Sequence, residues 1–149
     1  MNPYTRKLTV GLATVGLASV IASLALTVMP FTTSTAWAQT VLLEENGALE
    51  EGDMVLPSDN SLYDEFQIEG TEGQRLMVRM KSEDFVTYLA ILDPENPANP
   101  VLGENGNVSD SNDSQLEVTL PRDGTFVVIA NGLDNTSRGA YTLEVMVLD

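Results

Sequence analysis

The chain has 149 residues, with 22 acidic and seven basic side chains and a formal net charge of −15. It contains no histidine and no cysteine, so it cannot build a Ser-His-Asp triad, a Cys-His pair or a zinc site of the usual ligands. An acidic surface repels phosphates and anionic headgroups, so we expect neither nucleic acid nor an anionic membrane surface as a partner.

The N-terminal segment has the pattern of an export signal. Two basic residues at 6–7 precede an uncharged stretch over 8–29, and small residues follow at Ala36 and Ala38. Small residues at these two positions fit the pockets of a signal peptidase, which predicts cleavage before Gln39. The alternative is an uncleaved anchor, because the apolar stretch reaches the roughly 20 residues that span a bilayer. Either way, the rest of the protein is expected to be secreted or periplasmic.

This reading divides the chain into a signal peptide over residues 1–38 and one domain over residues 39–149. All 22 acidic residues lie in the domain, whereas two of the seven basic ones leave with the signal, so the exported form has a net charge of −17. Without cysteine, that domain must be held by packing alone or with a bound ion.

The first clear strands are expected over residues 62–69 and 75–81, where apolar residues alternate with polar ones. Asp64 falls on the apolar face of the first of them. A hairpin between the two strands would place acidic residues opposite Arg75 and Arg79, and such pairs help to set the register. A crossover between two sheets is the alternative.

The middle of the domain contains a predicted central strand and two loops. Residues 86–92 are apolar on both faces, which is typical of a strand inside a sheet. Three prolines make residues 93–100 a stiff surface loop. A short strand is possible at 101–102, and a polar loop is expected over 103–114.

The C-terminal third predicts three more strands. Residues 115–120 alternate, 125–130 are apolar on both faces, and 141–147 present a continuous apolar face. The Pro-Arg-Asp-Gly sequence at 121–124 predicts a turn, and residues 131–139 a longer loop. About seven to nine short strands with such turns indicate an all-β sandwich or barrel.

Four segments in this order resemble the bacterial pre-peptidase C-terminal domain family. They are GQRLMV (73–78), DFVTYLAILDP (84–94), LPRDGTFVV (120–128) and GAYTLEV (139–145). The resemblance covers residue 47 to the C-terminus and implies a jelly-roll-like antiparallel β-sandwich. It also implies a non-catalytic accessory module, here standing alone behind a signal peptide.

From these features we expect an exported binding module with a protein or polysaccharide partner, and no enzymatic activity. A structural envelope protein held by an uncleaved anchor is the alternative, and a small hydrolase that uses two carboxylates is a further one. An exposed aromatic strip would favour carbohydrate. Tyr63, Tyr88 and Tyr141 are the candidates, although Tyr88 and Tyr141 are expected in the core, since their strands are apolar.

Some relatives of this family bind calcium, and a strongly acidic domain would gain from a cation that neutralises clustered carboxylates. The candidate ligands are Glu104, Asn105, Asp110, Asn112 and Asp113, with Asp84 or Asp93 as possible additions from across the fold. Relatives have Phe-Asp-Thr where this chain has Phe85-Val86-Thr87, so one carboxylate is missing. We therefore expect weak or no specific calcium binding and no other cofactor.

Overall fold

The computed structural model describes residues 39–106 and 110–148, and the predictions for residues 1–38 lie outside them. The described residues form nine strands and no helix. The strands are β1 (Val41–Leu49), β2 (Met54–Val55), β3 (Leu62–Gly70), β4 (Arg75–Lys81), β5 (Thr87–Leu92), β6 (Val101–Gly106), β7 (Ser114–Thr119), β8 (Gly124–Gly132) and β9 (Gly139–Leu148). Consequently, the described part of the chain holds no helix that is long and apolar enough to cross a membrane.

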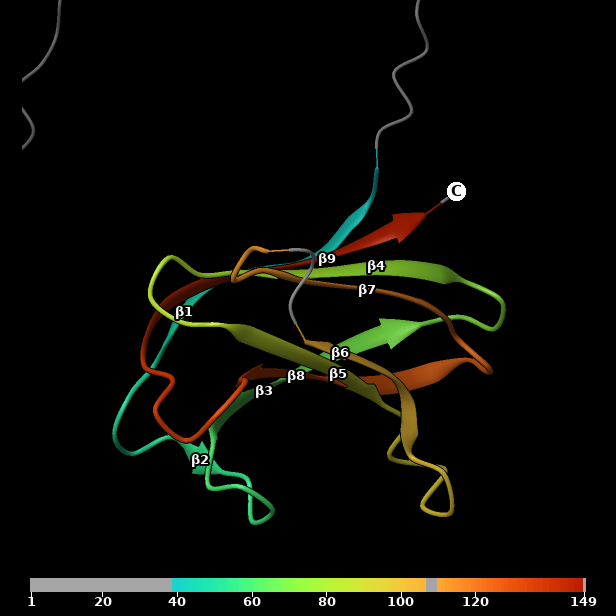
Figure 1. Cartoon of the computed structure of the whole chain (residues 1–149). Helices are drawn as coiled ribbons and strands as arrows, with labels where there is room; N and C mark the ends of the chain where they lie inside the picture. Colours follow the sequence, from blue (N-terminus) through green and yellow to red (C-terminus); the bar gives the residue numbers. More distant parts are fainter. Residues whose placement is uncertain (1–38, 107–109, 149) are drawn as a thin grey trace, which may run out of the picture. The chain divides into compact units, whose positions relative to one another are not determined.

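The strands make two antiparallel sheets that pack face to face (Figure 1). Sheet A has the order β1-β9-β4-β7, and sheet B has the order β2-β3-β8-β5-β6. Most neighbouring strands are distant in sequence, which is the topology of a sandwich with crossovers rather than of a meander. The predicted all-β, antiparallel sandwich is confirmed.

The core lies between the inner faces of the two sheets. It is built by residues at every second position, as the alternation predicts, and Tyr141 belongs to it with 2% of its surface exposed. The largest fully buried apolar side chains are Phe126, Leu49, Leu76, Met80, Leu89, Ile91, Leu120, Leu143, Val78, Val128 and Val145. Burial of each such side chain contributes about 1.5 to 3 kcal/mol, which lets the domain hold without disulfides.

The predicted hairpin between the strands at 62–69 and 75–81 is wrong, and the crossover is right. Strand β3 pairs with β8 in sheet B, whereas β4 lies between β9 and β7 in sheet A. The connection is held by the next turn rather than by its own strands, because Gly73 N donates to Leu120 O at 2.9 Å and Leu120 N donates to Gln74 O at 2.9 Å. Arg75 forms its ion pair with Glu117 of β7, at 3.4 Å.

The structure adds two strands to those expected from the sequence and lengthens two others. Residues 39–61, where β1 and β2 lie, receive no assignment from the sequence. The strand expected at 101–102 continues to Gly106, and the strand expected to end at residue 130 continues to Gly132. Both extensions run through polar residues, which pair with strand β5 through backbone hydrogen bonds and need no apolar pattern.

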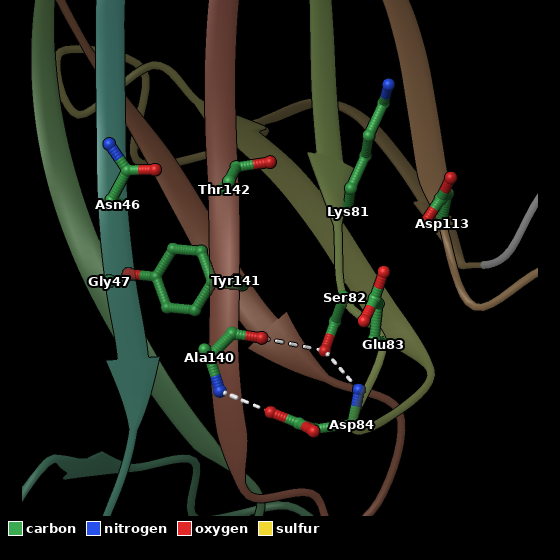
Figure 2. A pocket seen from close by; sticks show the side chains of 10 residues that line it. All are labelled: Asn46, Gly47, Lys81, Ser82, Glu83, Asp84, Asp113, Ala140, Tyr141 and Thr142. Atoms are coloured by element: carbon green, nitrogen blue, oxygen red, sulfur yellow. Dashed lines mark hydrogen bonds between the residues drawn. The ribbon is translucent and has the colours of Figure 1, made fainter.

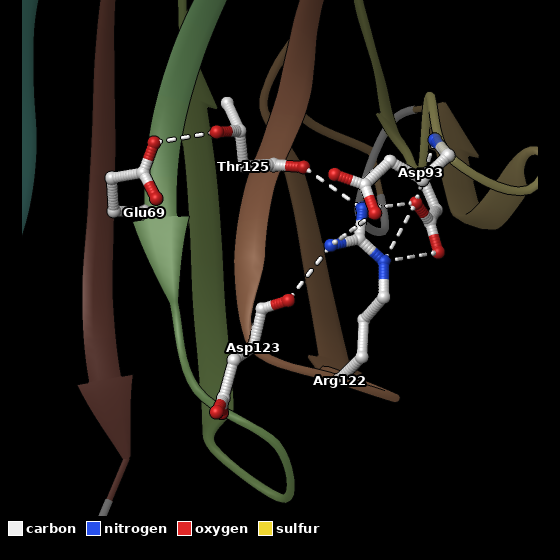
Figure 3. Close-up of polar contacts among 6 residues, drawn as sticks. Glu69, Asp93, Arg122, Asp123 and Thr125 are labelled. Carbon is white, nitrogen blue, oxygen red and sulfur yellow. Dashed lines mark hydrogen bonds and ion pairs between the residues drawn. The ribbon is translucent and has the colours of Figure 1, made fainter.

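The predicted turn at 121–124 is present and is stabilised by Arg122 (Figure 3). The guanidinium lies 2.6 Å from a carboxylate oxygen of Asp93, which is 2% exposed, and it sits 4.9 Å from the ring centre of Phe126. Its hydrogen bonds hold the pKa of Asp93 below its usual range. Gly124 has φ +134°, and a side chain there would collide with the guanidinium.

The four family-like segments therefore contact one another and build the scaffold. The first and third meet at Gly73 and Leu120, and the second and third meet at Asp93 and Arg122. The second and fourth meet where Asp84 accepts a hydrogen bond from the Ala140 N–H at 2.8 Å. Their joint role is to connect the two sheets.

Candidate binding groove

A groove of about 430 Å³ lies on the outer face of sheet B. Its floor comes from the outward side chains of β5, β6 and β8, and one wall is the loop between β2 and β3. We call this feature the sheet B groove. Its lining residues are Leu56, Ser58, Asp59, Tyr88, Ala90, Leu92, Val101, Glu104, Ile129, Asn131, Gly132 and Leu133.

Two tyrosines flank an asparagine in one row across the sheet. Asn131 of β8 is the register partner of Tyr63 on β3 and of Tyr88 on β5. Neighbouring strands lie about 5 Å apart, so both rings stand close to the amide. The alternation that buries Leu62 and Leu89 directs the tyrosines outward. Tyr88 and Asn131 line the groove, and Tyr63 stands next to Asn131 outside its lining.

The wall of the groove is fixed by its own hydrogen bonds. Asn131 Nδ2 donates to Ser61 Oγ at 3.1 Å, and Ser61 donates from both its N–H and its hydroxyl to Asp59 Oδ1, at 2.9 and 2.7 Å. These bonds, led by the Ser61 N–H, lower the pKa of Asp59. Asn60 takes the left-handed φ of 61°, which closes the turn. The groove thus carries an ionised carboxylate in a preformed loop.

The opposite side of the groove holds a tyrosine–carboxylate pair. Burial raises the pKa of the Tyr88 phenol, and its hydrogen bond to Glu104 raises it further. The ring needs the space beside Gly106, where a Cβ would lie 2.9 Å from Tyr88 Cδ2 and 3.3 Å from Leu133 Cδ1. Tyr88 is therefore held in position by β6 and by Leu133.

Tyr88 corrects the expectation that this residue lies in the core. It is half-buried and lines the groove, whereas Leu89 and Ile91 on the other face of β5 are fully buried. Its strand is apolar on both faces because the outer face forms the groove floor. Of the five large exposed apolar side chains among the described residues, Val101 and Leu133 line the groove, and Met54 is the register partner of Tyr63 on the same outer face. Apolar groups gathered on one face are typical of an interaction surface.

The two sheets differ in their basic side chains, although both carry acids. The five strands of sheet B contain no lysine and no arginine, and their outward acids are Glu65, Glu69 and Glu104. Sheet A carries basic residues along β4, listed here as Arg75, Arg79 and Lys81. The lining of the sheet B groove therefore holds two acidic side chains, Asp59 and Glu104, and no basic one.

A second pocket, of about 610 Å³, lies at one end of sheet A (Figure 2). Two of its polar side chains, Ser82 and Asp84, bond the backbone. Ser82 Oγ donates to Ala140 O at 2.8 Å and accepts from Asp84 N at 3.0 Å, and Asp84 accepts from Ala140 N. Gly139 has φ +126°, and a Cβ there would lie 2.4 Å from Asp84 Cβ. We interpret this pocket as the junction that fixes the start of β9.

The candidate calcium ligands on β6 point in different directions. Glu104 faces the sheet B groove. Asn105 instead points toward β7, where its Nδ2 donates to Gln115 O at 2.7 Å. Of the two possible additions, Asp84 accepts from Ala140 N and Asp93 is paired with Arg122.

The remaining candidates lie in the loop before β7. Asp110 is exposed with φ 59°, and Asp113 lines the pocket at the end of sheet A. The main-chain carbonyl of Asn112 accepts from Thr87 N at 2.8 Å and from Thr87 Oγ1 at 2.7 Å. Within residues 39–106 and 110–148, no three acidic side chains are grouped so as to hold one metal ion. The expectation of weak or no specific calcium binding stays a prediction.

No family model and no curated protein matches the chain. Among solved structures, it is similar to the periplasmic inhibitor of g-type lysozyme, PliG, from Aeromonas hydrophila, with 12% identity over 71% of this chain and 85% of that one and a TM-score of 0.51. It is also similar to the pre-peptidase C-terminal domain of collagenase from Bacillus anthracis, with 12% identity over 70% and 89% and a TM-score of 0.51. The chain has the fold of that domain. At this identity, the likeness concerns the fold alone, so the fold that the four segments imply is confirmed.

Proposed function

We propose that this protein is an exported, non-catalytic binding module that takes a protein or polysaccharide partner in the sheet B groove. The observation that carries the proposal is the pair of Tyr88 and Asn131 in a preformed, mostly apolar depression, with Tyr63 beside Asn131 on the next strand. Binding sites typically combine apolar walls with a few fixed polar groups. Tyrosine supplies both a large contact area and a hydroxyl.

The chemistry of the groove supports binding rather than turnover. Its acidic lining residues are Asp59 and Glu104. A general acid needs a raised pKa, whereas hydrogen bonds from Ser61 lower that of Asp59. With no histidine or cysteine in the chain, an activated nucleophile of the common kinds has no base or thiolate.

The fold supports the same role by analogy. One neighbour is named as a lysozyme inhibitor, which acts on a protein, and the other as the pre-peptidase C-terminal domain of a collagenase. The basic residues at 6–7, the uncharged stretch and the small residues at Ala36 and Ala38 support export.

Capture from the native exported fraction tests the proposal. The tagged chain, purified in the form that its cell exports, is compared with Tyr88→Ser and with Glu117→Gln on the outer face of sheet A. We expect an identified partner to bind the wild type and Glu117→Gln equally and Tyr88→Ser at least about tenfold more weakly, because truncated aromatic anchors cost affinity. A partner that ignores Tyr88 would contradict the groove, and hydrolysis of a peptidase, esterase or glycosidase substrate would contradict the non-catalytic role.

A further inference from the structure

The charge of the sheet B groove points to the chemistry of its occupant. Two carboxylates, Asp59 and Glu104, line a depression in a sheet whose strands contain no basic residue. Elsewhere in the described domain, the basic side chains either belong to strand β4 of sheet A or already have hydrogen-bond or ion-pair partners. Arg122 is paired with Asp93 and Glu95, and Arg138 donates to main-chain carbonyls of its own loop. Nothing within the groove balances its acids.

We infer that the sheet B groove binds a basic segment of a protein partner, with an arginine or lysine side chain laid against Tyr88 and the carboxylates of Glu104 and Asp59. This inference rests on the proposed function and specifies its partner. A carboxylate accepts charge-assisted hydrogen bonds from a cation, and a tyrosine ring attracts one through its π face. The groove brings both kinds of group together.

The geometry favours a cation over a glycan. A neutral polysaccharide would cover Asp59 and Glu104 without supplying a counter-charge, and burying an unpaired carboxylate is costly. An anionic polysaccharide would be repelled by the same two groups and by Glu65 and Glu69 on the outer face of β3. A cation instead offsets the desolvation of the carboxylates, while the apolar floor at Ala90 and Ile129 accepts the methylene stem.

Peptide titration by nuclear magnetic resonance tests the inference on the exported protein. The probes are a short peptide of glycine, serine and arginine, its glutamine analogue of equal length, and cellohexaose as a neutral glycan. We expect the arginine peptide alone to shift the backbone amide signals around Tyr88, Glu104 and Asn131. Its affinity should fall as salt rises from about 50 to about 300 mM, since the ion pairs are partly exposed.

The matched variants are Glu104→Gln and Glu117→Gln, which remove the same charge from edge strands of the two different sheets. Glu104→Gln should weaken binding of the arginine peptide at least about tenfold, whereas Glu117→Gln should leave it within about twofold. Tyr88→Phe keeps the ring and should bind better than Tyr88→Leu, which loses the π face. Unchanged signal dispersion elsewhere in the spectrum shows that each variant is folded.

The outcomes separate this inference from the proposed function. Equal losses in Glu104→Gln and Glu117→Gln, or signal shifts spread over both sheets, would mean nonspecific attraction and would overturn it. Cellohexaose shifting the groove signals while the arginine peptide does not would also overturn it, but would leave a binding groove. No shift from any probe would overturn it too, and the capture of the native partner through Tyr88 would then still decide the proposed function.

Discussion

Tyr141 on β9 donates a hydrogen bond from its phenol to Asp64 on β3, and so joins the two sheets across the core. The tyrosine is 2% exposed, and burial, followed by this hydrogen bond, raises its pKa far above the usual value. The ring passes beside Gly47 of β1, where a Cβ would lie 2.4 Å from the phenol oxygen. The acidic residue on the apolar face of β3 thus has a specific partner.

Tyr141→Phe is expected to destabilise the domain by about 1 to 3 kcal/mol, because the half-buried Asp64 carboxylate loses its donor. Urea unfolding followed by circular dichroism measures the change. Asp64→Asn is the control, since its amide oxygen still accepts the bond, and its loss should be smaller. An unfolding midpoint unchanged by Tyr141→Phe would contradict a stabilising role for this contact.

The ion pair between Arg122 and Asp93 predicts a stability change at acid pH. The hydrogen bonds from Arg122 lower the pKa of Asp93 from 3.8 in the folded state. A lowered pKa stabilises the fold above the unfolded-state value, and this contribution is lost as the pH falls through the folded-state value. Arg122→Gln should therefore lower the melting temperature at pH 7 and flatten its decline below pH 3.8. Thermal melts from pH 7 to pH 2 test this, and parallel curves for both proteins would refute it.

Thr87 is expected to be a second polar anchor of the core. It is fully buried, and its Oγ1 lies 2.7 Å from Asn112 O and 2.7 Å from Ser114 Oγ. Thr87→Val keeps the shape but removes the hydroxyl, so we expect a loss of about 1 to 3 kcal/mol in urea unfolding. The matched control is Thr119→Val on the exposed side of β7, with a change within about 0.5 kcal/mol. Equal effects at the two sites would argue against the anchor.

The strands that the sequence predicts well are those in which apolar and polar residues alternate, because one face packs on the core and the other faces solvent. Strands β4, β7 and β9 each have an apolar face toward the core and a polar face toward solvent, and a period of two is diagnostic there. Strand β1 carries Glu44, Glu45 and Asn46 in succession and is held at the edge by its ladder with β9. A strand held by backbone hydrogen bonds in this way needs no alternation of apolar and polar side chains, so the sequence does not predict it.

The sequence predicts neither the crossover between β3 and β4 nor the groove, because both depend on contacts between segments that are distant in the chain. A four-residue connection after Gly70 suits a hairpin or a crossover, and the choice is made by Leu120, which bonds the connection from the next turn. Likewise, Asp59 joins Tyr88 and Glu104 in one groove only because β8 brings β3 and β5 into one sheet. An apolar strand at 86–92 predicts burial on both sides and cannot indicate that one side is a groove.

Signal cleavage is predicted between Ala38 and Gln39. Intact-mass analysis of the exported protein should give the mass of residues 39–149, because small side chains at Ala36 and Ala38 fit the peptidase. Ala38→Leu should block processing and leave the chain in the membrane, whereas Thr35→Val should not. A wild-type product that retains residues 8–29 in the membrane would favour the anchor instead.

Calcium is expected to give no specific stabilisation. The acids that could complete a site are engaged elsewhere, with Asp93 on Arg122 and Asp84 on Ala140, and Val86 offers no carboxylate. Thermal melts in millimolar CaCl₂ and MgCl₂ at matched ionic strength should shift together, since both ions only screen the net negative charge. A rise of several degrees with calcium alone, abolished by Asp110→Ala or Glu104→Ala, would instead show a real site formed by the loop before β7.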